Sequence, residues 1–172
     1  MPLIELKTWP TMSKEEKKEF IYSVTELTTK LLKIVPDKIQ IVIHELPKEN
    51  WGKAGAVATD AEFVMKSRMI NWQSQESYPT QASNVDGMAI IAIDIWNTFD
   101  QVTKNQWVSQ LTQIASQFTH APMDNVLIVI REMIPGNWGQ SGVTGADPEF
   151  LSKSRFKTRK EEEVDERIFR LL

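Results

Sequence analysis

The 172-residue chain contains no cysteine, and this absence excludes disulfide bonds, thiolate metal ligands and cysteine nucleophiles. Long hydrophobic runs are missing too: no stretch approaches the roughly 18 apolar residues of a membrane span, and the start has no signal-peptide pattern. The formal net charge is only -3, with acids and bases interspersed, so nothing indicates a nucleic-acid surface. These absences predict a soluble cytoplasmic protein with neither a membrane nor a nucleic-acid partner.

Histidine is scarce as well, and the chain has no pattern typical of a cofactor site. His44 and His120 lie far apart in the sequence and lack carboxylates at ligand spacing, so no metal site is predicted. No glycine pair is followed by the Lys-Ser or Lys-Thr of a phosphate-binding loop. We therefore expect no cofactor.

What the chain does contain is an internal repeat at an offset of 87 residues. The segment from His44 to Arg68 aligns with the segment from Arg131 to Arg155, and eleven of these 25 positions are identical. The run IQIVIHEL aligns with VLIVIREM without a gap. The sequence thus predicts a tandem duplication with units at 1–69 and 88–156, a polar linker at 70–87, and a charged tail at 157–172.

Each unit has the pattern strand, helix, strand. Apolar or alternating runs predict strands at Leu3–Lys7, Ile90–Ile95, Ile39–Leu46 and Val126–Met133. Ser13 and Asp100 are expected N-caps, apolar residues then recur at helical spacing, and Pro36 and Pro122 are expected to end the helices. A strand, a crossover helix and a second strand form a right-handed βαβ unit with parallel strands.

Turns and the tail complete the pattern. Trp51-Gly52 with Gly55, and their counterparts 87 residues later, predict turns in which glycine provides a positive φ. In the tail, Val164, Ile168 and Leu172 have helical spacing, which predicts a solvated terminal helix with one apolar edge or, alternatively, a helix that docks a partner.

Pro2 begins the first unit, whereas Ala89 occupies the equivalent position of the second. If Met1 is removed, Pro2 becomes a secondary amine, and an N-terminal amine has an ordinary pKa of roughly 7.7–8.0 that apolar surroundings lower. Such an amine can act as a general base near neutral pH. Alternatively, a proline at position 2 serves only to permit removal of Met1. The rest of the chain must therefore decide between a catalytic role and this simpler one.

Pro2, the length of the βαβ unit and the motif IVIHELPKENWGKAG, with its second copy IVIREMIPGNWGQSG, resemble the 4-oxalocrotonate tautomerase branch of the tautomerase superfamily. The resemblance covers roughly 1–68 and 88–155 and implies an α+β fold of two tandem βαβ units related by a pseudo-twofold axis, with a four-stranded mixed sheet backed by two helices. It further implies that Pro2 is the general base or acid in tautomerisation of a small 2-oxo acid or enol, or in a related dehalogenation, hydration or decarboxylation. A fused chain of this kind is expected to form a homotrimer.

The sequence departs from this family at the positions of its two usual arginines. Thr11 to Ser13 and Phe99 to Asp100 occupy the first, and Gln40 and Leu127 occupy the second. Without that bidentate clamp a dicarboxylate substrate is disfavoured, and a monoacid is expected. Only one catalytic amine is expected per chain, because Ala89 is an internal residue.

Strand alternation places His44 on the face of Gln40, and Arg131 on the face of Leu127. We therefore expect Arg131 or His44 to bind a substrate carboxylate or to stabilise an enolate near Pro2. The alternative is that each lies at a strand end with its charge in solvent or paired with a neighbouring residue. Trp51 matches the family's aromatic wall beside the proline, although core packing explains it equally well. Two functions remain: a cofactor-independent tautomerase, favoured by Pro2, and a non-catalytic oligomeric protein for binding or assembly, favoured by the absent arginines.

Overall fold

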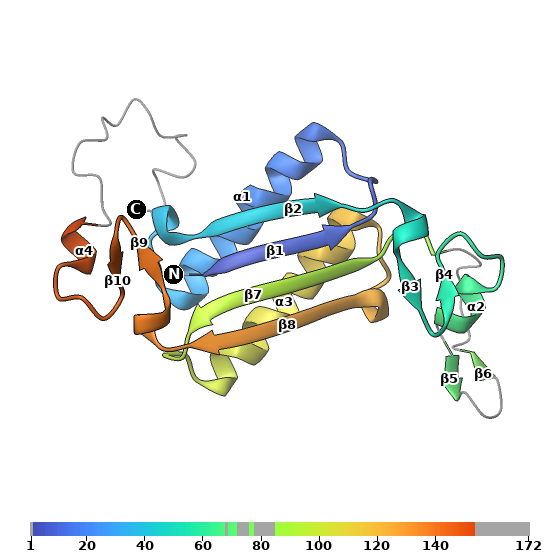
Figure 1. The fold of residues 1–172 in the computed structure, drawn as a ribbon. Helices are drawn as coiled ribbons and strands as arrows, with labels where there is room; N and C mark the ends of the chain where they lie inside the picture. Colours follow the sequence, from blue (N-terminus) through green and yellow to red (C-terminus); the bar gives the residue numbers. More distant parts are fainter. Residues whose placement is uncertain (1, 68, 72–75, 78–84, 154–172) are drawn as a thin grey trace.

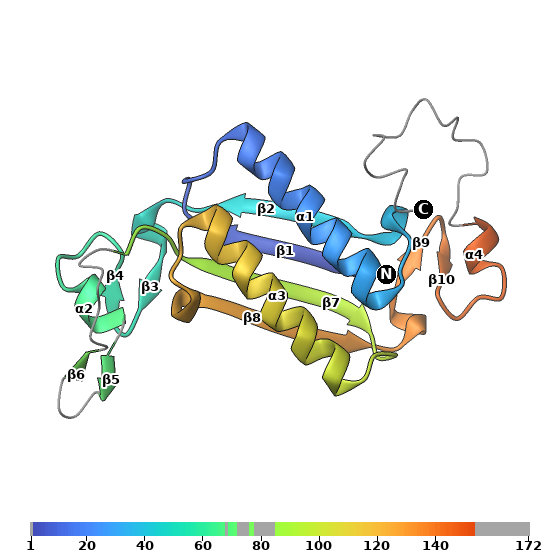
Figure 2. The ribbon, with the colours of Figure 1, turned by 180° about the vertical axis from the view of Figure 1, so that it is seen from behind.

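The structure, a computed structural model, describes residues 2–67, 69–71, 76–77 and 85–153. Its centre is a four-stranded sheet in the order β2-β1-β7-β8, and two helices cover one face of that sheet (Figure 1 and Figure 2). The strands are β1 (Leu3–Thr8), β2 (Gln40–Glu45), β7 (Ala89–Trp96) and β8 (Val126–Met133), and the helices are α1 (Lys14–Leu32) and α3 (Gln101–Thr119). The fold class expected from the sequence is confirmed.

The duplication is visible in the register of the strands. β1 pairs with β2 in parallel, with Leu3 opposite Gln40, and β7 pairs with β8 in parallel, with Ile90 opposite Leu127. Both members of the second pair lie 87 residues after their counterparts. β1 and β7 join the two units as an antiparallel pair, with Leu3 opposite Asp94. An antiparallel join between two similar parallel pairs gives the sheet its pseudo-twofold axis.

Both long helices begin where the sequence predicts. The Glu16 amide donates to Ser13 Oγ at 3.2 Å while the Ser13 amide donates to Glu16 Oε2 at 2.7 Å, so the expected capping box is present. At the start of α3, the Thr103 amide donates to Asp100 Oδ1 at 2.7 Å. These side chains satisfy amides that have no partner within the helix.

The helices end earlier than the prolines that were expected to stop them. Lys33 follows α1 with a φ of 55°, and His120 follows α3 with a φ of 57°. A residue in the left-handed region ends the helical hydrogen-bonding pattern by itself. Pro36 and Pro122 come later, at the short 3-10 helices η1 (Pro36–Lys38) and η3 (Met123–Asn125).

The core lies between the sheet and the helices. Its largest fully buried members are Ile4, Leu6, Phe20, Ile91, Ile93, Ile95, Trp107 and Leu111. Trp107 Nε1 donates to Thr28 Oγ1 at 3.2 Å, which links α3 to α1 across the pseudo-twofold axis. The predicted helix positions Leu27, Leu31, Ile114 and Phe118 are half-buried and pack against this core.

A short segment follows each unit's second strand. After β2 come η2 (Lys48–Asn50), β3 (Gly52–Lys53), β4 (Ala56–Val57) and α2 (Phe63–Ser67); after β8 come η4 (Pro135–Asn137), β9 (Gly139–Gln140), β10 (Val143–Thr144) and α4 (Phe150–Lys153). The predicted positive φ is present at Gly55 (75°) and Gly142 (78°). In Figure 1, the β3–α2 segment lies where β7 and β8 begin, and the β9–α4 segment lies where β1 and β2 begin. Each unit therefore places its last segment beside the start of the other unit.

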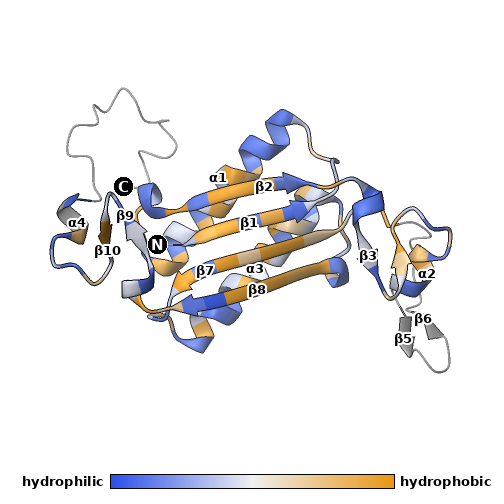
Figure 3. Cartoon of the chain, viewed as in Figure 1, coloured by the Kyte–Doolittle hydropathy of each residue, from blue (hydrophilic) through white to orange (hydrophobic). Residues whose placement is uncertain are grey.

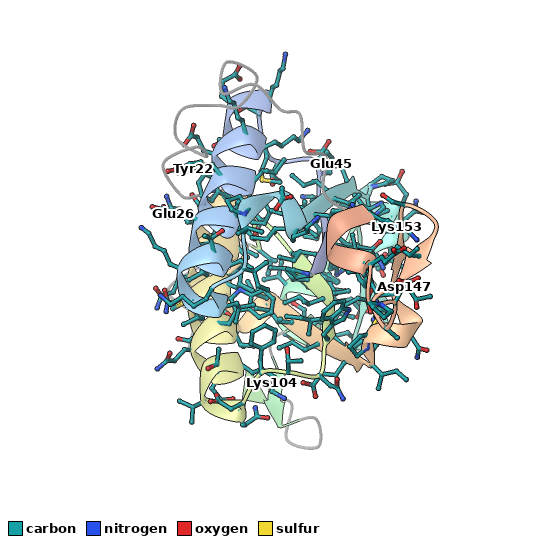
Figure 4. The ribbon with its side chains drawn as sticks, turned by 90° about the vertical axis from the view of Figure 1, so that its left-hand side faces the viewer. Tyr22, Glu26, Glu45, Lys104, Asp147 and Lys153 are labelled. Atoms are coloured by element: carbon teal, nitrogen blue, oxygen red, sulfur yellow. The ribbon has the colours of Figure 1, made fainter. Side chains whose placement is uncertain are left out.

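Figure 4 views the molecule from the end that carries β9, β10 and α4. Asp147 and Lys153 of this segment lie on the side of the sheet opposite Tyr22 and Glu26 of α1. The β9–α4 segment thus extends towards the face of the sheet that the helices leave open, at the end where the chain begins (Figure 1).

The region between the units contains more structure than a plain linker. β5 (Met69–Asn71) and β6 (Glu76–Ser77) form a small antiparallel pair, with Asn71 opposite Glu76. Just before β7, Gly87 passes so close to the end of α3 that an added Cβ would lie 1.9 Å from the carbonyl oxygen of Thr119. The tail at 157–172, predicted as a helix, lies outside the described residues. No helix within the described ranges is both long and apolar enough to span a membrane.

Candidate functional site

Pro2 is buried and directly precedes β1. Its carbonyl oxygen accepts a hydrogen bond from the Gln40 amide at 3.1 Å, which holds the beginning of the chain against the beginning of β2. On the other side of β1, Leu3 lies opposite Asp94, near the end of β7. Two strands therefore fix the position of Pro2, and the fold brings one predicted site residue, Gln40, next to it.

The open face of the sheet carries the other polar candidates. Because strand side chains alternate, the rows on this face follow from the register. The row nearest Pro2 contains Gln40, Leu3, Asp94 and Arg131, and the row furthest from it contains His44, Lys7, Ile90 and Leu127. Figure 3 shows that the strands are largely hydrophobic between these polar ends.

Arg131 lies at the same end of the sheet as Pro2, but on β8, two strands away from β1. Its Nη2 is 2.7 Å from Asp94 Oδ2 on the neighbouring strand. The Arg131 side chain is more than half exposed, so it remains accessible to a further group. Within one chain, Arg131 is thus close to the Pro2 end of the sheet and is engaged by a carboxylate.

His44 lies four residues beyond Gln40 on β2, about 13 Å further along the strand. Its Nε2 is 3.7 Å from Glu5 Oε1. The structure therefore does not bring His44 to Pro2 within a single chain.

Trp51 is also at the opposite end of the sheet from Pro2. It is buried in a second apolar cluster with Trp9, Phe63 and Met88. Its equivalent, Trp138, is half-buried and begins the β9 segment, which lies at the Pro2 end (Figure 1). Within one chain Trp138 therefore lies at the end of Pro2, as does Trp96 at the end of β7. The sequence of one unit taken alone does not reveal this placement of Trp138.

A cavity of about 320 Å³ lies beside Trp51, at the start of the second unit. Six of its lining residues are Trp51, Lys53, Met88, Ala89, Asn125 and Leu127. Ala89, the counterpart of Pro2, is among them, so this cavity is the second unit's version of the Pro2 site. Shifting Ala89, Asn125 and Leu127 back by 87 gives Pro2, Lys38 and Gln40 of the first unit. Shifting Trp51 and Lys53 forward by 87 gives Trp138 and Gln140 of the second unit.

Lys38 is a buried residue that the sequence analysis did not single out. It is 5% exposed, and no other Asp, Glu, Lys, Arg or His among the described residues is buried. Its Nζ is 3.5 Å from Asp37 Oδ2. Lys38 corresponds to Asn125, which lines the cavity at Ala89, and the repeat alignment was the signal that could have identified it.

The two ends also differ in their polar groups. At the Ala89 end, Lys53 Nζ donates to Asn125 Oδ1 at 2.5 Å. This hydrogen bond fixes the orientation of the Asn125 side-chain amide, whose Nδ2 group then points away from Lys53. At the Pro2 end, the equivalent residues are Gln140 and Lys38. Gln140 Oε1 is buried without a hydrogen-bond partner. The Pro2 end therefore combines a buried lysine with a buried acceptor, and no cluster of His, Asp or Glu in the described part of the chain could hold a metal ion.

The comparisons with known proteins agree with this geometry. The family model described as tautomerase enzyme matches residues 2–61. A probable tautomerase of Halalkalibacterium halodurans is 32% identical over 60 residues, which cover 35% of this chain and 98% of that protein. A 2-hydroxymuconate tautomerase of Comamonas testosteroni is 33% identical over 60 residues, or 35% of this chain and 95% of that protein.

Similarity among solved structures extends over both units. A structure described as a fused 4-OT wild-type symmetric trimer superimposes with a TM-score of 0.64 and 13% identity, covering 84% of this chain and 99% of that one. At such low identity the match supports the shared fold. The family model thus matches the first unit, whereas the structural similarity covers 84% of the chain and therefore extends into both units.

Proposed function

Because the chain belongs to the tautomerase family, in its 4-oxalocrotonate tautomerase-like branch, we propose that it is a cofactor-independent tautomerase whose base is the amine of Pro2. The observation that supports this most strongly is the position of Pro2, buried at the start of β1 and fixed by the hydrogen bond from Gln40. After removal of Met1 the amine takes a proton from one atom of a 2-oxo acid or enol and returns it to another.

The buried position suits this chemistry. An N-terminal amine is ordinarily half protonated near pH 8, and desolvation disfavours its charged form, which lowers its pKa. A neutral amine is then present at neutral pH and can accept a proton. The cavity at Ala89 is formed by the residues equivalent to those at Pro2, but it contains no free amine. Each chain therefore has one catalytic site.

The substrate that we propose is a small monoacid. The relative from Comamonas testosteroni acts, by its name, on 2-hydroxymuconate, which carries two carboxylates. Here Gln40 and Leu127 replace residues that could have clamped a second carboxylate, and Arg131 is already paired with Asp94. A single carboxylate with an apolar substituent fits these side chains better.

We further propose that the active form is a homotrimer. Val42, Leu127 and Val129 leave apolar surface exposed on the open face of the sheet, and a fused structural relative is described as a trimer. In such an assembly, His44 and Trp51, which lie at the opposite end of the sheet from Pro2, can reach only the Pro2 site of another chain, whereas Arg131 lies at the Pro2 end of its own chain. Their roles as substrate-binding residues remain predictions of the sequence.

The alternative is a non-catalytic member kept for binding or assembly, and the absent arginines favour it. The third function is dehalogenation, hydration or decarboxylation by the same amine, and activity of the parent but not of Pro2→Ala on a substrate of one of these reactions would support it. All three share the fold and differ only in the chemistry at Pro2.

The test is the ketonisation of phenylenolpyruvate followed by ultraviolet absorbance, with removal of Met1 first verified by intact mass. We expect Pro2→Ala to lower kcat/KM at least about 100-fold, the contribution typical of a positioned general base. Ala89→Gly is the matched control at the equivalent strand position and is expected to retain activity. Equal, background-level rates in the parent and Pro2→Ala would favour the binding function.

A further inference from the structure

The cavity at Ala89 has the size and the lining of a small-molecule site. Its volume of about 320 Å³ lies at the lower end of the roughly 300–1,000 Å³ that such sites occupy. Apolar side chains form most of the lining, and its polar side chains are Lys53, Asp124 and Asn125. A mainly apolar cavity with a few polar groups is typical of a site that binds and orients a small ligand.

Asn125 is the most deeply buried of these polar residues. It is 4% exposed, and its Oδ1 accepts a hydrogen bond from Lys53 Nζ at 2.5 Å. Its Nδ2 group is buried without a hydrogen-bond partner among the described residues. A buried N–H group that has lost its hydration and has no acceptor is unfavourable. A ligand oxygen that reached this group would supply the missing acceptor.

Lys53 brings a positive charge to the same cavity. It lies in β3, is half-buried, and contacts Asn125 of the second unit through its ammonium group. A bound carboxylate would add a charge-assisted hydrogen bond to the contacts that this ammonium already makes. Asp124 has the opposite charge, but it is exposed, so solvent and salt screen it more than they screen the half-buried lysine. The cavity therefore favours an anion over a cation.

The internal repeat shows that the lysine of this pair is not a chance surface charge. Lys53 aligns with Gln140, and Asn125 aligns with Lys38. Each of the two pairs of positions thus contains one lysine and one amide, in exchanged places. The N-terminal amine, by contrast, has no counterpart in the second unit. The cavity at Ala89 therefore has a positive charge but lacks the base.

Trp51 indicates the shape of a suitable ligand. It is 6% exposed and belongs to the apolar cluster that contains Trp9 and Phe63, so its ring is held firmly where it lines the cavity. Aromatic rings pack favourably on an indole in offset or edge-to-face arrangements. Leu127, which also lines the cavity, is 55% exposed, so the cavity borders solvent on that side. A small molecule with a flat apolar body fits this lining.

We propose that the cavity at Ala89 is a second, non-catalytic binding site, which takes a small monocarboxylate with an aromatic body. The carboxylate accepts hydrogen bonds from Lys53 and Asn125, and the aromatic body packs on Trp51. Since this cavity has no equivalent of the Pro2 amine, the ligand is bound and released unchanged. The inference goes beyond the proposed function and does not depend on the chemistry at Pro2.

The test is a titration of the protein with 3-phenylpropionate, which has one carboxylate, an aromatic ring and no keto group. Binding is followed by NMR of the ¹⁵N-labelled indole groups of the six tryptophans. The Trp51 signal, assigned with Trp51→Phe, is the probe of the cavity at Ala89, and the Trp138 signal is the probe of the Pro2 end. We expect the Trp51 signal to shift in a saturable manner.

Lys53→Gln is the main variant, because glutamine is the residue at the equivalent position of the second unit, Gln140. We expect it to raise the Kd obtained from the Trp51 signal about tenfold, as loss of a hydrogen bond to a charged group does. Lys66→Gln is the matched control. It removes a lysine that pairs with Glu62 and does not line the cavity, and it should leave the Kd unchanged.

A second probe and a second variant complete the experiment. 2-Phenylethylamine has the same ring with the opposite charge and should not shift the Trp51 signal at the same concentrations. Pro2→Ala, which tests the proposed function, should leave the Trp51 titration unchanged, so a failure of catalysis and a failure of this site are measured separately.

Three results would overturn the inference. The first is a Trp51 signal that does not move, either because a neighbouring chain covers the cavity or because the ligand binds only at the Pro2 end. The second is an equal Kd for the parent and Lys53→Gln, since the ligand would then bind through apolar contacts alone. The third is binding of 2-phenylethylamine as tightly as 3-phenylpropionate, which would show that the cavity does not select an anion.

Discussion

Trp51 and Trp138 occupy equivalent positions in the two units but belong to different ends of the sheet. Trp51 is buried with Trp9 and Phe63 and lines the cavity at Ala89, whereas Trp138 is half-buried at the end where Pro2 lies. An aromatic neighbour lowers the pKa of an amine by excluding water from it. Within one chain we expect Trp138 to do this for Pro2.

Replacing Trp138 by alanine is therefore expected to lower kcat/KM for phenylenolpyruvate about tenfold at pH 7, because a more hydrated amine is protonated to a larger extent. Trp51→Ala should leave kcat/KM within about twofold but reduce the free energy of unfolding by about 3 kcal/mol, as loss of a large buried side chain does. Steady-state kinetics and urea denaturation of both variants provide the measurements. The reverse pattern of activities would show that the aromatic wall is Trp51 from a neighbouring chain.

The positions of some candidate site residues could be predicted from sequence and those of others could not, for a physical reason. Pro2 and Gln40 were identifiable because each has a fixed place at the start of a strand. Lys38 lies in a 3-10 helix of three residues, where no periodicity indicates which side chains are buried. The location of Trp138 depends on the antiparallel pairing of β1 with β7, a long-range contact that neither unit specifies alone.

At the scale of the element, the two long helices begin with different caps. α1 has a serine with a complete capping box, and α3 has Asp100, which accepts from Thr103. The hydrogen bond from the Thr103 backbone amide holds the pKa of the Asp100 carboxyl below its ordinary value of 3.8. This part of the stability therefore depends on pH.

The direction of that dependence follows from the lowered pKa. The folded state favours the carboxylate, so the contribution of Asp100 is fully present above about pH 4 and is lost as the pH falls through the lower folded-state pKa. Asp100→Asn retains a capping oxygen but does not titrate. We expect the stability advantage of the parent over this variant to shrink between pH 6 and pH 3 in urea denaturation. An advantage that stays constant over this range would contradict the capping role of the charge.

The elements themselves were largely predictable, because apolar periodicity and caps act locally. The exceptions are informative. The helices end just before Lys33 and His120, which adopt a positive φ. A positive φ is uncommon for residues other than glycine, so the prolines further on were the stronger sequence signal. The pair β5 and β6 was not expected, since each strand has at most three residues and lies in a polar segment.

At the scale of the whole molecule, the duplication gives a sheet with one covered face and one open face. The helices bury the inner face, while Val42, Leu127 and Val129 remain exposed on the other face. A single chain cannot cover this surface with its own helices, since both lie on the opposite side (Figure 2). Apolar residues on an open sheet face are typical of an interface.

The proposed trimer can be tested at this face. Val129 is 41% exposed at the middle of β8, and placing a lysine there would require burial of an unpaired charge in any interface formed by the sheet. We expect Val129→Lys to convert the trimer into monomers, measured by size-exclusion chromatography with light scattering at a fixed protein concentration. Val102→Lys on α3 is the control, because Val102 is 66% exposed on the helical side and should tolerate the charge.

The same pair of variants connects assembly with catalysis. If another chain completes the Pro2 site, Val129→Lys should lose activity on phenylenolpyruvate together with its trimeric state, while Val102→Lys retains both. If the residues at the Pro2 end of one chain suffice, the monomeric variant should keep most of its kcat/KM. A Val129→Lys protein that remains trimeric would show that the open face is not the interface, and the exposed valines would then require another explanation.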